Sequence, residues 1–140
     1  MHIFTYGSLM FPPIWQRVVR GHYRSATATL SAYARYALRD DSYPGMVAQP
    51  DSVVEGVLYY DVDAQDVAEL DRFEGHEYRR EEVNVVIESG ASVIACTYIF
   101  LAEQRLSGLP WEPQGFRLSR FIDTYIEAEA SADSSDKLGG

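Results

Sequence analysis

Hydrophobic positions that alternate with polar ones, rich in β-branched and aromatic residues, predict about six strands in this chain. The segment 24–38 alternates loosely without a helical period, which predicts either one long bent strand or two consecutive ones. The other strands are expected at 2–6, 53–60, 78–88 and 93–100. A four-residue loop at 89–92 joins the last two as a hairpin, so this pair is predicted to be antiparallel.

A predicted turn and an internal glycine interrupt the strand region before residue 60. The Tyr43-Pro44-Gly45 step is predicted to turn the chain. Gly56 lies inside the strand expected at 53–60, where a glycine marks a bulge or a close approach by another backbone.

Helical spacing of hydrophobic residues predicts short helices between the strands. The first covers 14–20, follows two prolines and is expected to stop at Gly21. The second begins after Asp63, a suitable N-cap, and ends at Gly75. Asp66 lies in the first turn of this second helix, where the helix dipole favours a negative charge.

Three segments with different compositions are predicted in the last part of the chain. Residues 108–115 contain two prolines and are predicted to form an ordered surface loop, followed by a helix over 116–127. Residues 128–140 are mostly Ala, Ser, Asp and Gly, which predicts a disordered tail. We therefore expect a single domain over 1–127.

Composition narrows the class of protein. The chain has 140 residues, 46% of them hydrophobic, enough for one core. Strands and helices do not alternate as βαβ units, which favours an α+β fold with a curved, mostly antiparallel sheet or barrel. The formal net charge of -9 argues against nucleic-acid binding. No uninterrupted apolar stretch approaches the roughly 18 residues of a membrane span, and no signal peptide is recognised, so a cytoplasmic protein is expected.

Residues that bind metals or cofactors show no suitable spacing. The three histidines, His2, His22 and His76, have no partner at i,i+4 and no cysteine pair. Glycine-rich phosphate-binding motifs are missing from the sequence, so neither a metal nor a cofactor is predicted. The single cysteine, Cys96, is interpreted as a small buried strand residue rather than a reactive thiol, and it fits a reducing compartment.

The junction Tyr6-Gly7-Ser8-Leu9, directly after the first strand, is one candidate site. Gly7 lets the backbone approach a ligand closely, and successive N–H groups after a strand can bind a carboxylate or an oxyanion. An ordinary turn is the alternative. Ser8 lacks the G-x-S-x-G pattern of a hydrolase nucleophile.

Glu74, near the end of the second helix, is the other candidate. At about 100° per residue it lies on the same face as Val67 and Leu70, so its carboxylate is expected to point inward. Burial and the negative end of the helix dipole both raise a carboxyl pKa, which suits a proton shuttle near neutral pH. Alternatively the helix frays, and Glu74 swings out to pair with Arg79 or Arg80.

Other polar residues near these two positions have open or supporting roles. Asp71 is expected to accept hydrogen bonds from the backbone or from an arginine. Among the tyrosines on or beside predicted strands, Tyr78 and Tyr98 are predicted to present a hydroxyl to a polar ligand at a barrel mouth. Arg35 and Arg39 are either carboxylate partners or solvated strand residues, and the second interpretation is favoured.

Three separated motifs resemble one family. They are Y-G-S-L at 6–9, Y-P-G at 43–45 and L-D-R-F-E-G-H-E-Y-R-R at 70–80. In order and spacing they are similar to the γ-glutamylcyclotransferase superfamily, in its AIG2-like branch. The resemblance implies a small mixed, mostly antiparallel β-barrel with flanking helices, a pocket at the barrel mouth, and no metal or organic cofactor.

The resemblance also implies an activity and its residues. The loop Tyr6 to Leu9 would hold the γ-glutamyl group of a small peptide or amine, and Glu74 would be the acid/base that assists release of 5-oxoproline. Free γ-glutamyl amino acids are usually processed by members with Asn after Y-G-S, where this chain has Leu9. The alternatives are a non-catalytic small-ligand-binding or stress-response module, and then a hydrolase based on Ser8.

Overall fold

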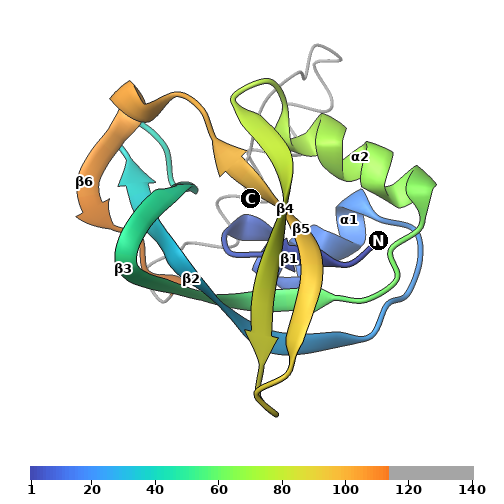
Figure 1. Cartoon of the computed structure of the whole chain (residues 1–140). Coiled ribbons are helices and arrows are strands. Elements are labelled where there is room, and N and C mark those ends of the chain that lie inside the picture. Colours follow the sequence, from blue (N-terminus) through green and yellow to red (C-terminus); the bar gives the residue numbers. More distant parts are fainter. Residues whose placement is uncertain (114–140) are drawn as a thin grey trace, which may run out of the picture.

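Five strands close into a barrel in this computed structural model, which describes residues 1–113 (Figure 1). Around the barrel the order is β3-β1-β5-β4-β2, and a β2–β3 pairing completes the ring. A sixth strand, β6, adds to β2. The strand bounds are β1 Ile3–Thr5, β2 Ser25–Leu38, β3 Pro44–Tyr59, β4 Tyr78–Ile87, β5 Ser92–Phe100 and β6 Leu106–Pro110.

Strand directions make the barrel mixed but mostly antiparallel, as expected from the sequence. β1 is antiparallel to β3, with Phe4 opposite Leu58, and parallel to β5 through Ile3 and Cys96. The other pairings are antiparallel, including the predicted β4–β5 hairpin. Cys96, predicted to be buried, is only half-buried on β5 because it belongs to the rim of the core.

β3 is longer than the strand predicted over 53–60, and it forms with β2 a hairpin that is sharply bent. Its register shifts between Ser31 and Tyr33, and Ala32 and Asp51 both have positive φ, 68° and 66°. Beyond this bend the hairpin curls towards β6 (Figure 1). The segment 24–38 is therefore one bent strand, one of the two predicted alternatives.

Two sequence predictions for strands and turns were wrong. Pro44 and Gly45 already belong to β3, since Pro44 pairs with Ala37, so the chain turns before them. The loop predicted over 108–115 overlaps β6, whose Pro110 pairs with Tyr36 of β2. Proline and glycine are tolerated at such an edge because only one side of the strand is hydrogen-bonded.

Gly56 allows a close backbone approach, which is one of the two alternatives predicted for it. A Cβ atom at this position would lie 2.1 Å from the carbonyl oxygen of Thr5. β3 can therefore pass directly over the end of β1 only with glycine there.

The α-helices α1 Pro12–Val18 and α2 Ala64–Glu74 lie on the right-hand side of the barrel in Figure 1. Two short 3₁₀ helices, η1 Ser8–Met10 and η2 Glu103–Arg105, follow β1 and β5. α2 has the predicted caps, because Asp63 accepts a hydrogen bond from the Asp66 N–H and Gly75 has φ 77°. α1 ends at Val18, before the predicted Gly21, since Val19 is already extended.

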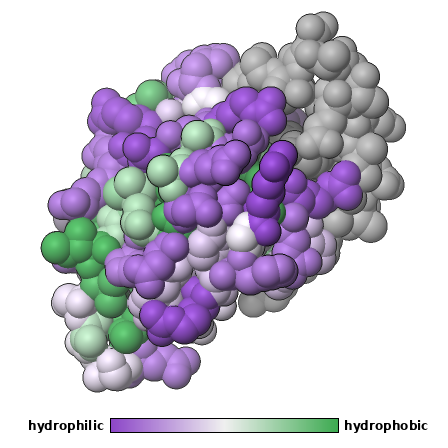
Figure 2. Space-filling view, turned by 90° about the vertical axis from the view of Figure 1, so that its right-hand side faces the viewer, coloured by the Kyte–Doolittle hydropathy of each residue, from purple (hydrophilic) through white to green (hydrophobic). Residues whose placement is uncertain are grey.

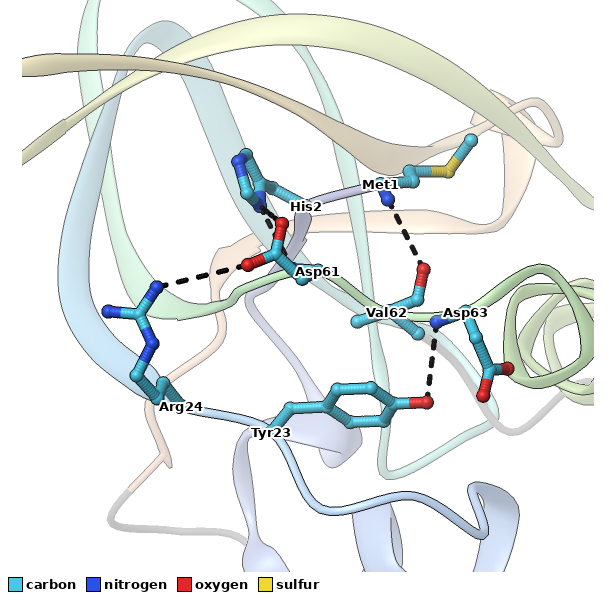
Figure 3. Close-up of polar contacts among 7 residues, drawn as sticks. All are labelled: Met1, His2, Tyr23, Arg24, Asp61, Val62 and Asp63. Carbon is cyan, nitrogen blue, oxygen red and sulfur yellow. Dashed lines mark hydrogen bonds and ion pairs between the residues drawn. The ribbon is translucent and has the colours of Figure 1, made fainter.

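The connection from β3 into α2 is held to the residues just before β1 and just before β2 (Figure 3). The Asp61 N–H donates to Nδ1 of His2 over 3.0 Å, and the Asp61 carboxylate lies 3.8 Å from Arg24. The Tyr23 hydroxyl accepts from the Asp63 N–H over 3.3 Å. These contacts fix where α2 begins, and so where its other end lies.

Two hydrophobic clusters fill the molecule. One occupies the barrel interior around Phe4, Tyr6, Met46 and Leu58, all with no exposed surface. The other packs the helices onto the barrel, with Trp15 stacked on Tyr59 at 3.7 Å between ring centroids, and it includes Leu70 and Phe73 of α2. The inward face of α2 is thereby held against the core.

The outer surface is mostly hydrophilic on the side seen in Figure 2, with hydrophobic residues along its lower left edge. None of the helices in the described part of the chain is both long enough and apolar enough to span a membrane. The helix predicted at 116–127 and the tail predicted at 128–140 lie outside the described residues, as does the predicted domain end.

Candidate functional site

Glu74, the last residue of α2, points inward as the helical spacing predicted. Its side chain is 1% exposed, and neither carboxylate oxygen has a hydrogen-bond partner within residues 1–113. The alternative of a frayed helix end is wrong, because Arg79 pairs with Glu81 and Arg80 with Asp71. A buried carboxyl without a partner costs stability, so its position calls for an explanation other than folding.

The environment of Glu74 favours its protonated form. Burial raises the pKa of Glu74 well above its ordinary value, and the nearby negative charge of Asp71 raises it further. The C-terminal end of α2 acts in the same direction, since carbonyl oxygens point out of the helix there. A carboxyl of this kind keeps its proton to a higher pH than an exposed glutamate does, and it can act as a general acid or base.

A pocket of about 290 Å³ opens beside this carboxyl. It lies between the end of α2 and the strands β4 and β5, and it is lined by Asp71, Glu74, Gly75, Tyr78, Arg79, Arg80 and Tyr98. Three residues expected in the site from the sequence, Glu74, Tyr78 and Tyr98, are therefore brought together here.

Asp71 anchors the rim of the pocket. Its Oδ1 accepts a hydrogen bond from the Tyr98 hydroxyl over 2.8 Å, and its Oδ2 accepts one from Arg80 Nη1 over 2.5 Å. This confirms the predicted role of Asp71 as an acceptor for an arginine. The network also places a negative charge one helical turn before Glu74.

Tyrosine hydroxyls tie the three sequence motifs together. Tyr78 donates to the carbonyl of Pro44 over 2.8 Å, which joins the 70–80 motif to the 43–45 motif. Tyr6 of the 6–9 motif donates to the carbonyl of Tyr98 over 2.5 Å, and the Tyr98 hydroxyl in turn donates to Asp71 of the 70–80 motif. Burial is the main cause that raises the pKa of Tyr6, Tyr78 and Tyr98, and the charge of Glu74 contributes in all three cases. The motifs thus meet around Glu74.

The Tyr6 to Leu9 loop is buried rather than open at its side chains. Gly7 is buried, Ser8 and Leu9 have no exposed surface, and Ser8 begins the 3₁₀ helix η1. Within the described residues, these three do not line the pocket beside Glu74. The structure connects the loop to the pocket through the Tyr6 side chain.

The surroundings of one arginine were not predicted correctly from the sequence. Arg35, favoured as a solvated strand residue, is half-buried and donates to the Tyr6 carbonyl over 2.6 Å. The interpretation holds for Arg39, which is exposed. Each arginine follows a small or hydrophobic residue in the sequence, so no local signal separates them.

Within residues 1–113, no group of three or more His, Cys, Asp or Glu side chains is arranged to hold a metal ion.

The geometry defines a class of protein: a small mixed barrel whose longer helix ends in an inward carboxyl that has no hydrogen-bond partner within residues 1–113. The family model described as gamma-glutamyl cyclotransferase, AIG2-like, matches residues 3–116. The chain belongs to this family. AIG2-like protein D of Arabidopsis thaliana is 31% identical over 88 residues, which cover 62% of this chain and 58% of the relative.

Solved structures share the fold. An Arabidopsis thaliana protein known from a solution structure has a TM-score of 0.70 at 24% identity, covering 95% of this chain and 84% of its own. A structure named gamma-glutamyl cyclotransferase has a TM-score of 0.65 at 14% identity, covering 90% of this chain and 97% of its own. At these identities the likeness concerns the fold alone.

Proposed function

We propose that this protein is a γ-glutamyl cyclotransferase that releases 5-oxoproline from a small γ-glutamyl peptide or γ-glutamyl amine. One observation carries the proposal: in a chain of this family, the Glu74 carboxyl is buried beside a pocket and has no hydrogen-bond partner in the described residues. Such a group is poised for proton transfer rather than for structural pairing.

The chemistry needs no protein nucleophile. The α-amine nitrogen of the substrate attacks its own γ-carbonyl carbon, so ring closure is intramolecular and depends mainly on orientation. Glu74 accepts the proton that the amine loses as the new C–N bond forms. The same carboxyl then returns this proton to the leaving nitrogen as the old C–N bond breaks. The protein ends each cycle unchanged.

The Tyr6 to Leu9 loop is the proposed grip on the γ-glutamyl group. Backbone N–H groups after β1 would hold the α-carboxylate or stabilise the oxyanion of the tetrahedral intermediate. Tyr78 and Tyr98 are proposed to line the substrate site beside Glu74. Their hydroxyls already donate to Pro44 and Asp71, so these rings would shape the pocket more than bind polar atoms.

The cytosol is the proposed location of this reaction. A single free cysteine accords with a reducing compartment. No cofactor is part of the proposal, because the proton transfers and the ring closure need none.

Release of 5-oxoproline tests the proposal directly. A panel of γ-glutamyl dipeptides, γ-glutamyl amines and glutathione would be incubated with wild type, Glu74→Gln and the matched control Glu69→Gln. Glu69 lies on the same helix, has a partly exposed side chain and forms an ion pair with Arg72. Release by wild type and control, but not by Glu74→Gln, supports the function and the role of Glu74.

Other outcomes would count against it. Equal release by all three proteins would remove Glu74 from the mechanism. No release by folded wild type from any compound would favour a non-catalytic ligand-binding module, which a ligand titration followed by NMR would then examine.

A further inference from the structure

Arg35 of β2 joins three segments that are far apart in the sequence. Its Nη1 donates to the carbonyl of Tyr6 over 2.6 Å and to the carbonyl of Glu55 over 3.1 Å. Its guanidinium lies over the ring of Trp111, 5.2 Å from the ring centroid. The side chain therefore contacts the start of the Tyr6 to Leu9 loop, β3 and the chain after β6.

The Tyr6 carbonyl needs a donor from elsewhere in the fold. Tyr6 is completely buried and follows the last residue of β1, whose ladder with β3 ends at the Thr5–Val57 pair. A buried carbonyl without a donor is costly, and a charged donor makes a shorter and stronger hydrogen bond than a neutral one. Arg35 supplies this donor.

The bend of the β2–β3 hairpin brings Arg35 to this place. Ala32, with φ 68°, shifts the register just before Tyr33, and Arg35 follows on the curled half of β2. Trp111, 7% exposed, covers the guanidinium and is itself held by donation from its Nε1 to the Ser42 carbonyl over 2.8 Å. Partial burial lowers the pKa of Arg35 from its ordinary value, yet an arginine stays charged.

Holding one carbonyl orients the next N–H group. The peptide between Tyr6 and Gly7 is planar and contains no cis bond, so its N–H points away from its C=O. With the carbonyl held by Arg35, the Gly7 N–H is turned to the opposite side. The position of this first peptide then limits the directions of the Ser8 and Leu9 N–H groups that follow it in η1.

We propose that Arg35 is a positioning residue for the Tyr6 to Leu9 loop, setting the direction of its N–H groups for the carboxylate or oxyanion of a γ-glutamyl substrate. The substrate part of this inference rests on the function proposed above. The orientation part does not, and it is measurable without catalysis.

Two variants and a matched control test the role. Arg35→Met keeps the length and packing of the side chain over Trp111 but removes every donor, and Arg35→Lys restores one charged donor. Arg39→Met makes the same change at an exposed arginine just after β2, whose Nε contacts only the Gln104 carbonyl at 3.3 Å among its side-chain hydrogen bonds in the described residues.

Residual dipolar couplings report the directions of the Gly7, Ser8 and Leu9 N–H bonds relative to the barrel. We expect them to change in Arg35→Met, to change less in Arg35→Lys and to stay as in wild type in Arg39→Met. Unchanged couplings in Arg35→Met overturn the proposal. If that variant does not fold, Arg35→Lys decides by the same measurement, and unchanged couplings there overturn it.

Kinetics separate positioning from stability alone. For the compound in the panel that wild type converts best, we expect Arg35→Met to lower kcat/KM about tenfold or more, the fold-change of one charge-assisted hydrogen bond, and Arg35→Lys to recover part of it. The change falls on KM where the N–H groups hold the carboxylate and on kcat where they hold the oxyanion. A lower Tm with both KM and kcat unchanged would show a merely structural role and overturn the proposal. If wild type releases no 5-oxoproline, the proposed function fails, while the dipolar couplings still decide whether Arg35 orients the loop.

Discussion

Two buried carboxylates on one helix, Asp66 and Glu74, have opposite surroundings. Asp66, 2% exposed, accepts hydrogen bonds from the N–H groups of Arg20 and Gly21 and from the Tyr23 hydroxyl, at 3.0, 2.9 and 2.5 Å. Glu74, 1% exposed, accepts none within the described residues. The first carboxylate holds the segment after α1 against α2, whereas the second has no such structural partner in the described residues.

The difference shows that burial by itself does not make a reactive carboxyl. Burial acts to raise the pKa of Asp66 too, but the hydrogen bonds from Tyr23, Arg20 and Gly21 outweigh it and the pKa is lowered. The pKa of Glu74 is raised by burial and by the charge of Asp71, with no donor to oppose them. Position on the helix adds to the contrast, since Asp66 is in the first turn and Glu74 is in the last.

The largest expected effect is on turnover. Glu74→Gln should lower the rate of 5-oxoproline release about 10²- to 10⁴-fold, because the amide cannot carry the proton from the attacking to the leaving nitrogen. Initial rates at saturating substrate, compared with wild type and Glu69→Gln, measure it. A loss of less than threefold would mean that another group moves the proton.

The next largest effect is on stability, at the other end of the helix. Asp66→Asn should lower the free energy of unfolding by about 2–3 kcal/mol, because buried donors lose a charged acceptor. Urea unfolding followed by circular dichroism measures it, with Asp63→Asn as the control, since Asn caps a helix about as well as Asp. Equal stability of Asp66→Asn and Asp63→Asn would contradict the structural role of Asp66.

The two carboxylates should also give stability opposite dependences on pH. The raised pKa of Glu74 means that its contribution is present below about pH 4 and is lost as the pH rises through the folded-state value. Glu74→Gln should therefore gain stability relative to wild type as the pH rises above about 4, by up to about 1.4 kcal/mol per pH unit until the folded-state pKa is reached, because the amide does not ionise.

For Asp66 the sign is reversed. Its lowered pKa means that its contribution is present above about pH 4 and is lost as the pH falls through the folded-state value. The deficit of Asp66→Asn should therefore shrink below about pH 4. Unfolding measured at several pH values checks both, and parallel curves for all proteins would refute the assigned protonation states.

The smallest effect concerns the neighbour that tunes Glu74. Asp71→Asn removes the negative charge that helps raise the Glu74 pKa and leaves Arg80 without its partner, so the Glu74 pKa should fall. The acid limb of the pH profile of kcat/KM should move to lower pH. Glu69→Gln, which removes a charge of the same sign from the same helix, should leave the limb in place. A shift in both variants would show a long-range charge effect only.

Local interactions explain the elements that were predictable from the sequence. The β4–β5 hairpin, the Asp63 N-cap and the Gly75 stop each depend on residues within a few positions of one another. The inward direction of Glu74 was predictable for the same reason, because helical spacing relative to Val67 and Leu70 decides it.

Contacts between distant segments explain the errors. α1 stops at Val18 because Asp66, far along the chain, takes the N–H groups of Arg20 and Gly21. β6 forms because β2 offers it an edge, although its own composition is that of a loop. Secondary-structure propensity predicts neither the end of α1 nor the formation of β6, because both depend on a partner that is distant in the sequence.

The sequence by itself determined the family, through three motifs in order, and the side of α2 that carries Glu74. Only the tertiary structure decided that this carboxyl has no partner in the described residues and that Asp66 has three. The hydrogen bond of Arg35 also depends on the tertiary structure, because a bend in β2 brings this side chain to the Tyr6 carbonyl. Periodicity specifies the direction of a side chain, whereas its pKa and its partners depend on which distant groups the closed barrel brings within hydrogen-bond reach.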